Sequence, residues 1–319
     1  MMTNRTTLWI FSLAAACWLT ACTDAQNPQT QNPQTRKTGK QDAAKQEAAR
    51  KAAKRAKEAA LSVLKKHKIE IDFRNKTITV PVVVNAPTDS IEYLLIHRNG
   101  KAHEAVLITH ARPSVLNSAF LFLGLKEGKN FDLKEKDPMP SEAEQRRGVS
   151  PHIEILPMGH RLYMTVSMAL EGGKQKVMAV EDLIFDLHTQ RPVTNTRWIY
   201  LGGRMAQLYR DEPEVYMADM EGNLVSTCYM RPKNHLLTMM HERSRDDQNW
   251  WLSEACPPPG TKMKLTFHVN KPAVVAEREK RVKEIKGKPA TMPAPGSGRV
   301  PGEGPRSRPS SKPTSRRDG

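Results

Sequence analysis

Among the polar residues whose types and spacing suit chemistry, His103 and Glu104 form the pair that we single out. They follow Asn99-Gly100, which lies between two apolar stretches and is the strongest short signal for a two-residue hairpin turn. A hairpin closed there places the two side chains on opposite faces of a sheet, so that they do not form an acid–base couple by themselves. We therefore favour a structural role for this pair and assign no catalytic residue.

Motifs of known enzyme classes are missing from the sequence. It has no nucleophile elbow, zinc-protease motif, P-loop, dinucleotide-binding loop or calcium loop. Two histidines and two methionines suggest a soft-metal site for copper, but methionine commonly fills apolar cores, and we prefer that explanation for His235, Met239, Met240 and His241. We expect no metal or other cofactor and a non-catalytic protein. The alternative is a hydrolase or metal-dependent enzyme that uses His103 and Glu104.

Acidic and aromatic residues come together at a second place. Asp246-Asp247 precede Trp250-Trp251, and acids beside an aromatic platform are typical of a sugar-binding site. An exposed acidic turn before a buried strand explains the same residues, and we prefer that interpretation.

The N-terminus has the features of a bacterial lipoprotein. An apolar segment over residues 8–19 leads into Leu19-Thr20-Ala21-Cys22, which resembles the lipobox, in which a cysteine is acylated and becomes the new N-terminus. We predict a signal peptide over residues 1–21 and lipid on Cys22, which anchors the protein to a membrane of the cell envelope. In a cell with two membranes, Thr23 favours the outer membrane, facing the periplasm.

Two of the four cysteines remain after these assignments. Cys17 leaves with the signal peptide and Cys22 takes the lipid, so Cys228 and Cys256 are left in a compartment that permits disulfides. We favour a disulfide between them. Two buried free thiols are the alternative, because the sequence does not show how close the two Cα atoms lie.

Positive charge is concentrated in the two flanks of the chain. Residues 23–68 carry 12 basic and 4 acidic side chains, and residues 271–319 carry 13 and 5, whereas residues 69–270 carry 24 and 25. A neutral central domain argues against nucleic-acid binding. The basic flanks suit anionic lipid, a wall polymer or an acidic protein as partners, in addition to the membrane that the lipid on Cys22 enters.

The composition divides the mature chain into four parts. Only 38% of the residues are hydrophobic and 23 are prolines, so we expect part of the chain to stay unfolded. Residues 22–40 form a polar spacer, residues 41–68 a basic, alanine-rich helical stalk, residues 69–270 a folded domain, and residues 271–319 a mostly disordered tail rich in Pro, Gly and Ser.

Strands are the main elements that must position the polar residues. Segments of alternating apolar and polar residues recur across residues 69–270, and Pro81 favours an edge position for the strand that contains it. One helix begins at Pro113, carries an apolar stripe and ends at Gly124. We predict an α+β fold, with a mainly antiparallel β domain and at least one packed helix, flanked by the helical stalk and the disordered tail.

Five short segments, in their order and spacing, resemble the YdjY-like domain of bacterial exported proteins: Gly100–Ala105, Arg112–Asn117, Leu123–Leu125, Trp198–Gly203 and Pro258–Thr261. The resemblance covers most of residues 69–270 and neither flank. It implies an exported protein and no particular reaction. Some members carry ferredoxin-like cysteine clusters, and because this sequence has none, the resemblance implies no iron–sulfur cofactor.

Overall fold

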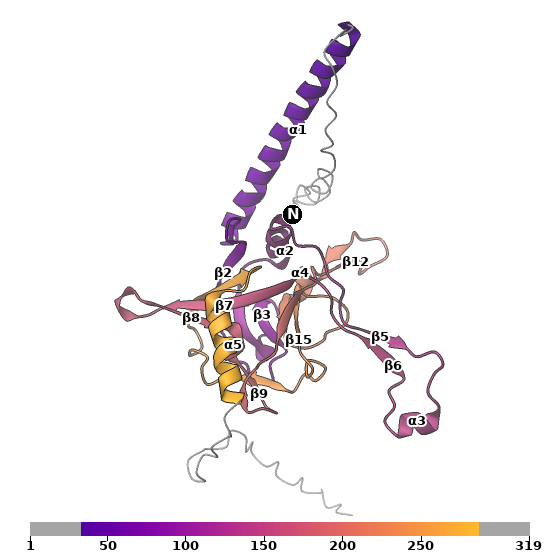
Figure 1. Cartoon of the computed structure of the whole chain (residues 1–319), viewed down its shortest axis with the longest axis vertical. Coiled ribbons are helices and arrows are strands. Elements are labelled where there is room, and N and C mark those ends of the chain that lie inside the picture. The colour runs from indigo at the N-terminus through magenta and orange to yellow at the C-terminus, as the bar shows by residue number, and fades with distance from the viewer. Residues whose placement is uncertain (1–32, 287–319) are drawn as a thin grey trace, which may run out of the picture. The chain divides into compact units, whose positions relative to one another are not determined.

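The computed structural model describes residues 33–286, and Figure 1 shows their arrangement. The predicted signal peptide, the lipid site at Cys22 and most of the predicted C-terminal tail lie outside these residues. The chain divides into two compact units, Met1–Glu279 and Lys280–Gly319, and every strand belongs to the first.

The elements have the following bounds. The helices are α1 (Pro33–Lys66), α2 (Pro113–Phe122), α3 (Glu142–Arg146), α4 (Met217–Glu221) and α5 (Ala273–Lys286), with short 3-10 turns η1 (Ala102–Glu104), η2 (Glu171–Gly173) and η3 (Val180–Leu183). The strands are β1 (Glu70–Asp72), β2 (Thr77–Val84), β3 (Tyr93–His97), β4 (Ala105–Thr109), β5 (Asp132–Glu135), β6 (His152–Ile155), β7 (Arg161–Ala169), β8 (Gln175–Ala179), β9 (Ile184–Asp186), β10 (Arg191–Pro192), β11 (Arg197–Tyr200), β12 (Met205–Ala206), β13 (Val215–Tyr216), β14 (Asn223–Ser226), β15 (Leu237–Met240), β16 (Trp250–Leu252) and β17 (Lys262–His268).

The main sheet closes into a barrel. Its strands follow the order β2-β17-β7-β11-β15-β14-β3-β4, and β4 pairs back onto β2, with Val83 opposite Ile108. β1 and β8 are not among the strands that close this ring, and they pair with β2 and β7 respectively. The expected α+β class with a mainly antiparallel sheet agrees with this structure, although the closure was not predicted. Two pairs of adjacent strands, β14–β15 and β3–β4, are parallel.

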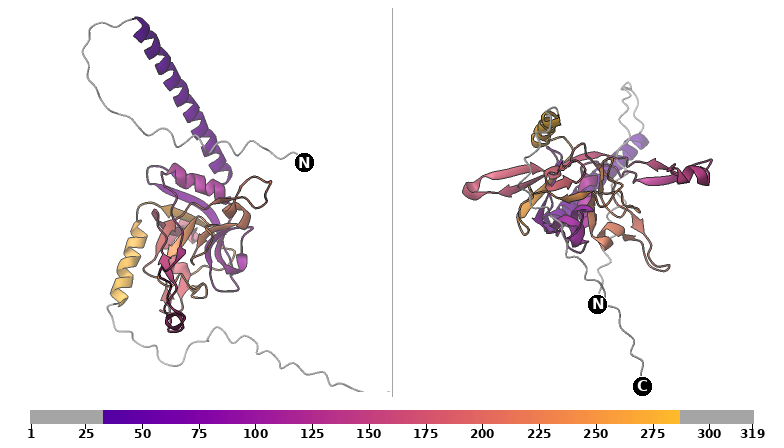
Figure 2. Two further views of the ribbon diagram at one scale, coloured as in Figure 1. Left: turned by 90° about the vertical axis from the view of Figure 1, so that its right-hand side faces the viewer. Right: turned by 90° about the horizontal axis from the view of Figure 1, so that it is seen from below.

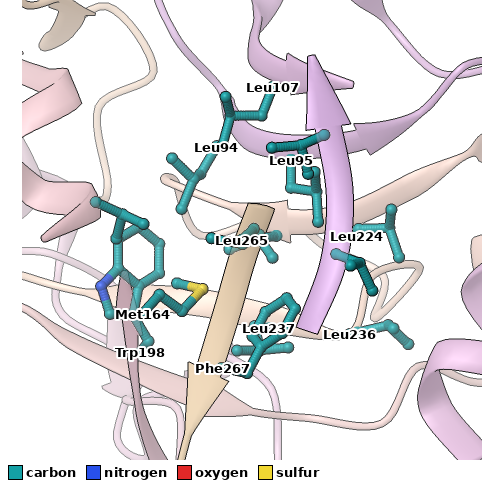
Figure 3. Close-up of a cluster of buried hydrophobic side chains, with 14 of the residues drawn as sticks. Leu94, Leu95, Leu107, Met164, Trp198, Leu224, Leu236, Leu237, Leu265 and Phe267 are labelled. Atoms are coloured by element: carbon teal, nitrogen blue, oxygen red, sulfur yellow. The ribbon is translucent and has the colours of Figure 1, made fainter. Parts of the chain in front are cut away.

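Large apolar side chains from the strands fill the barrel, as Figure 3 shows for one cluster. Residues far apart in sequence meet there, since Leu94 and Leu107 come from β3 and β4, Trp198 from β11, and Leu265 from β17. All four are at most 1% exposed. Burial of this much apolar surface is the main source of the domain's stability.

Helix α2 packs against this core through the predicted apolar stripe. Phe120 lies 5.1 Å, centroid to centroid, from both Tyr200 of β11 and Phe267 of β17. The Tyr200 hydroxyl donates a 2.6 Å hydrogen bond to Oδ1 of Asn117, so the buried phenol is satisfied by the same helix. Gly124, with φ of +83°, ends the segment as predicted.

Pro81 lies in an interior strand, so the expected edge position for β2 is wrong. β17 pairs along one side of β2, while on the other side β1 pairs with residues 77–79 and β4 with residues 83–84. The Pro81 carbonyl accepts a 2.8 Å hydrogen bond from the Thr109 hydroxyl, and therefore faces the side that β1 and β4 share. A residue's N and C=O point to the same side of a strand, so the missing N–H of Pro81 falls in the gap between two partners.

Two hairpin arms extend from opposite sides of the barrel, β7–β8 on one and β5–β6 with α3 on the other (Figure 1, Figure 2).

In α1, residues 45–59 are exposed, whereas Leu64 near the end of the helix is only 2% exposed. Within residues 33–286, none of the helices combines the length and the apolar character that crossing a membrane requires.

Candidate functional site

His103 and Glu104 lie in η1, within a short crossover between parallel strands, and the expected hairpin is wrong. Tyr93 pairs with Ala105 and His97 with Thr109, so β3 and β4 run in the same direction. A type I′ hairpin turn needs positive φ at both central residues, and neither Asn99 nor Gly100 has one.

Gly100 has a packing role there instead. A Cβ at this position would lie 2.9 Å from the carbonyl oxygen of Gly222 and 3.0 Å from Cβ of Ile96. Glycine is therefore needed because the crossover passes directly over the turn that enters β14.

The expected separation of the two side chains on opposite faces is also wrong, because a 3-10 turn does not alternate as a strand does. His103 Nε2 lies 3.1 Å from Glu104 Oε1. Lys101, at the start of the same turn, places its Nζ 3.4 Å from Glu104 Oε2 and 3.7 Å from Glu92 Oε2. The side chain of His103 is 57% exposed and that of Glu104 is 16% exposed, so the pair lies at the surface of the domain but is partly enclosed.

Glu92, immediately before β3, completes an acidic cluster that we define as Glu92, Lys101, His103 and Glu104. Its backbone N–H donates to the Glu104 carbonyl at 3.0 Å, which holds the two residues side by side. Burial raises the pKa of Glu92 to about 7, together with a hydrogen bond to the Glu104 carboxylate and repulsion from it, while the Lys101 ammonium opposes this rise. No pattern in the sequence marks Glu92, because only the parallel pairing of β3 and β4 brings it beside Glu104.

The acidic cluster can hold and release a proton near neutral pH. Its proton is the one on Glu92, whose pKa is raised to about 7, and Lys101 lies within 4 Å of both carboxyl groups while His103 lies beside that of Glu104.

A shallow, open cleft of about 510 Å³ is lined in part by Asp89 and Ser90, which come just before Glu92 in the sequence. Asp89, Ser90, Asp246, Gln248, Asn249 and Trp251 are among the residues that line it. Asp247, beside Asp246, is close enough to contribute to the raised pKa of Glu92. The acidic turn and an aromatic ring noted in the sequence thus meet at one surface.

The two tryptophans of that motif face opposite ways. Trp250 is fully buried in the core, and its ring lies edge-to-face with His241 at 5.1 Å. Trp251 is 41% exposed. The preferred interpretation, an acidic turn before a buried strand, describes Trp250, whereas Trp251 has the exposure of a platform.

The histidines and methionines considered for copper do not form a metal site. His235 and Met239 are buried, and burial lowers the pKa of His235 to about 4. Within the part of the chain that the structure describes, no group of three His, Cys, Asp or Glu side chains is arranged to hold a metal ion.

Cys228 and Cys256 are both free thiols in the structure, which differs from the favoured disulfide. Cys228 is buried at the end of β14, with its Sγ 3.5 Å from the Asp246 carbonyl oxygen and 3.7 Å from the Thr227 hydroxyl. Cys256 is half-buried in the turn after Ser253. The disulfide between them stays a prediction of the sequence.

Comparison with protein families matches residues 69–268 to the YdjY domain. Comparisons with curated proteins and with solved structures find no match. The matched segment begins just before β1 and ends with the last residue of β17, so it spans the whole barrel, α2, the acidic cluster and the cleft. Because the match covers more than half of the 319 residues, the chain belongs to the YdjY domain family.

Proposed function

We propose that this chain is a lipid-anchored protein of the cell envelope, whose barrel domain has a structural or binding role and no catalytic one. The apolar segment that ends at Cys22 supports the anchor. The observation that carries the binding role is the open cleft beside Trp251, because a large aromatic face left in solvent among polar side chains is typical of a ligand-binding surface.

In this proposal the flanks hold the domain away from the membrane. Residues 22–40 act as a polar spacer that runs into the beginning of α1, residues 41–68 act as a helical stalk, and residues 271–319 act as a basic tail that is mostly disordered beyond α5. The exposure of residues 45–59 in α1 supports the stalk, since a helix with so little apolar surface has nothing to bury. The excess of basic residues in both flanks suits an anionic lipid, a wall polymer or an acidic protein. In a cell with two membranes we place the protein on the outer one, facing the periplasm.

Labelling with a palmitate analogue, followed by membrane fractionation, tests the anchor. The Cys22→Ser variant is expected to take up no label and to leave the membrane fraction. Cys17→Ser is the matched control, because it removes the other cysteine of the N-terminal segment and is expected to keep both label and fractionation. Equal labelling of wild type and Cys22→Ser contradicts the proposal.

A second candidate is a hydrolase or metal-dependent enzyme that uses His103 and Glu104. The observation in its favour is the pKa of Glu92, raised to about 7, because a carboxyl group poised near neutral pH suits general acid–base catalysis. A hydrolytic activity that disappears in both Glu104→Gln and His103→Asn, while the melting temperature of each variant stays at the wild-type value, supports this candidate.

A further inference from the structure

The cleft beside Trp251 combines three features: an exposed aromatic face, two fixed carboxylates and a buried amide donor without a partner. We propose that it binds a pyranose ring of a glycan, through the face of Trp251 and the polar groups of Asp89, Asp246 and Asn249. The inference rests on the binding role proposed above and names the chemical class of the ligand.

Trp251 supplies the platform because the strand β16 fixes which way its ring points. Trp250 pairs with Asp186 and faces the core, so its neighbour Trp251 faces away from it. The indole N–H of Trp251 donates a 3.1 Å hydrogen bond to the Gln248 carbonyl. This bond uses the polar edge of the ring and leaves the apolar face to pack against the C–H face of a sugar.

Asp89 and Asp246 supply acceptors in fixed positions. Oδ1 of Asp89 accepts from the Ser90 N–H at 2.9 Å, and Oδ1 of Asp246 accepts from the Gln248 N–H at the same distance. Each carboxylate is therefore oriented through one oxygen, and the second oxygen is assigned to a ligand hydroxyl. Hydrogen bonds to a charged acceptor are stronger than neutral ones, so two such acceptors give the site a preference for hydroxyl donors.

Asn249 distinguishes this cleft from a surface patch that is only acidic. The residue lines the cleft and is only 3% exposed, yet its Nδ2 has no hydrogen-bond partner among the described residues. A buried donor is normally paired, and an unpaired one destabilises the fold. An oxygen atom of a ligand in the cleft would satisfy this group.

The same donor decides between a sugar and a cation as the ligand. Acidic side chains beside an aromatic ring also suit an alkylammonium ion, which would sit over Trp251 by a cation–π interaction. An alkylammonium has no acceptor for Nδ2 of Asn249. A hydroxylated ring donates to the two carboxylates and accepts from the amide, so it satisfies all three polar groups.

The test is isothermal titration of the full mature chain in detergent with a β-1,4-linked N-acetylglucosamine tetrasaccharide. Wild type is expected to bind this probe. Trp251→Ala is expected to bind about tenfold more weakly or not at all, since an aromatic residue at the centre of a contact is worth at least that factor. Tyr209→Ala is the matched control, because Tyr209 is a highly exposed aromatic residue outside the cleft, and it should bind as wild type does.

Asn249→Leu distinguishes loss of a ligand contact from loss of the fold. The substitution keeps the size of the side chain and removes a donor that has no protein partner, so the melting temperature is expected to stay the same or rise while binding weakens about tenfold. Three outcomes overturn the proposal: no heat with the tetrasaccharide, unchanged binding in Trp251→Ala, or spermine binding that requires Trp251 and excludes the sugar. Because membrane anchoring is measured separately through Cys22, failure here is distinguishable from failure of the lipoprotein proposal.

Discussion

The backbone N–H of Glu92 donates a 3.0 Å hydrogen bond to the carbonyl of Glu104, and the Nζ of Lys101 lies 3.7 Å from the carboxylate of Glu92 and 3.4 Å from that of Glu104. Burial of Glu92 and the neighbouring Glu104 carboxyl both raise the pKa of Glu92, and the single Lys101 cation only partly opposes them, so Glu92 retains a proton at a pH where an isolated glutamate has lost it. The arrangement exists because β3 and β4 start side by side in a parallel pair.

The Glu92→Gln variant should remove part of the pH dependence of stability. The pKa of Glu92 is about 7 in the folded protein and has its ordinary value of 4.5 when unfolded, so the folded state holds this proton to higher pH. The resulting stability is present below pH 4.5 and is lost as the pH rises to about 7. We expect the wild type to lose about 1–2 kcal/mol relative to the variant over this range, a figure reduced for solvent screening.

Urea unfolding at pH 5 and pH 8 measures this difference. Glu214→Gln is the control, because Glu214 is exposed, and it should follow the wild type at both values. If Glu92→Gln and wild type lose the same stability between the two pH values, the raised pKa is wrong.

Asp219 lies in α4 and should stabilise the N-terminus of α2. Its Oδ1 accepts the Ser114 N–H at 2.7 Å, and its Oδ2 accepts from Nε of Arg112 and from the Ser114 hydroxyl, both at 2.6 Å. A carboxylate at a helix N-terminus satisfies free N–H groups and complements the helix dipole. We expect Asp219→Asn to lower the free energy of unfolding by about 1–2 kcal/mol. Thermal unfolding measures the loss, and Asp211→Asn, at an exposed aspartate, should show none.

Local sequence patterns predicted the elements better than their partners. The α2 stripe and its end at Gly124 depend on residues within one segment, and both were predicted. Contacts between distant segments decide that β4 pairs with β2 and runs parallel to β3. A local pattern such as Asn99-Gly100 contains no information about those contacts. The close approach of Gly100 to Gly222 explains why a hairpin signal marks a crossover here.

The site was predictable only where it follows strand alternation. Trp250 and Trp251 are adjacent, so one of them had to face outward from any strand with a buried face. Nothing comparable in the sequence marks Glu92, since its raised pKa depends in part on Glu104, which only the parallel pairing of β3 and β4 brings beside it. The same holds for Asn249, whose unpartnered donor is visible only when its surroundings are known.

The thiols of Cys228 and Cys256 should react with a maleimide in denatured protein without reductant. In the native protein we expect slow reaction, because burial raises the pKa of Cys256 to about 11 and that of Cys228 further. At neutral pH the thiolate fraction of Cys256 is then about 10²-fold below that of a free cysteine. Mass spectrometry of the labelled peptides assigns each site, with Cys256→Ser as the control. Labelling that appears only after reduction would restore the disulfide that the sequence favoured.

The basic flanks should bind anionic membranes independently of the lipid on Cys22. The segment after Lys286 contains seven basic and two acidic residues, and such an excess of positive charge attracts anionic surfaces over a range that salt screens. The Cys22→Ser protein is therefore expected to sediment with vesicles containing phosphatidylglycerol at low salt, to be released at about 0.5 M salt, and to ignore pure phosphatidylcholine vesicles. Removal of residues 287–319 should weaken this binding and move its release to lower salt, because only residues 23–68 and the six basic residues of 271–286 then remain in the flanks. Undiminished binding after that removal, or binding that persists at high salt, would place the contact surface on the barrel domain and reject the role of the tail.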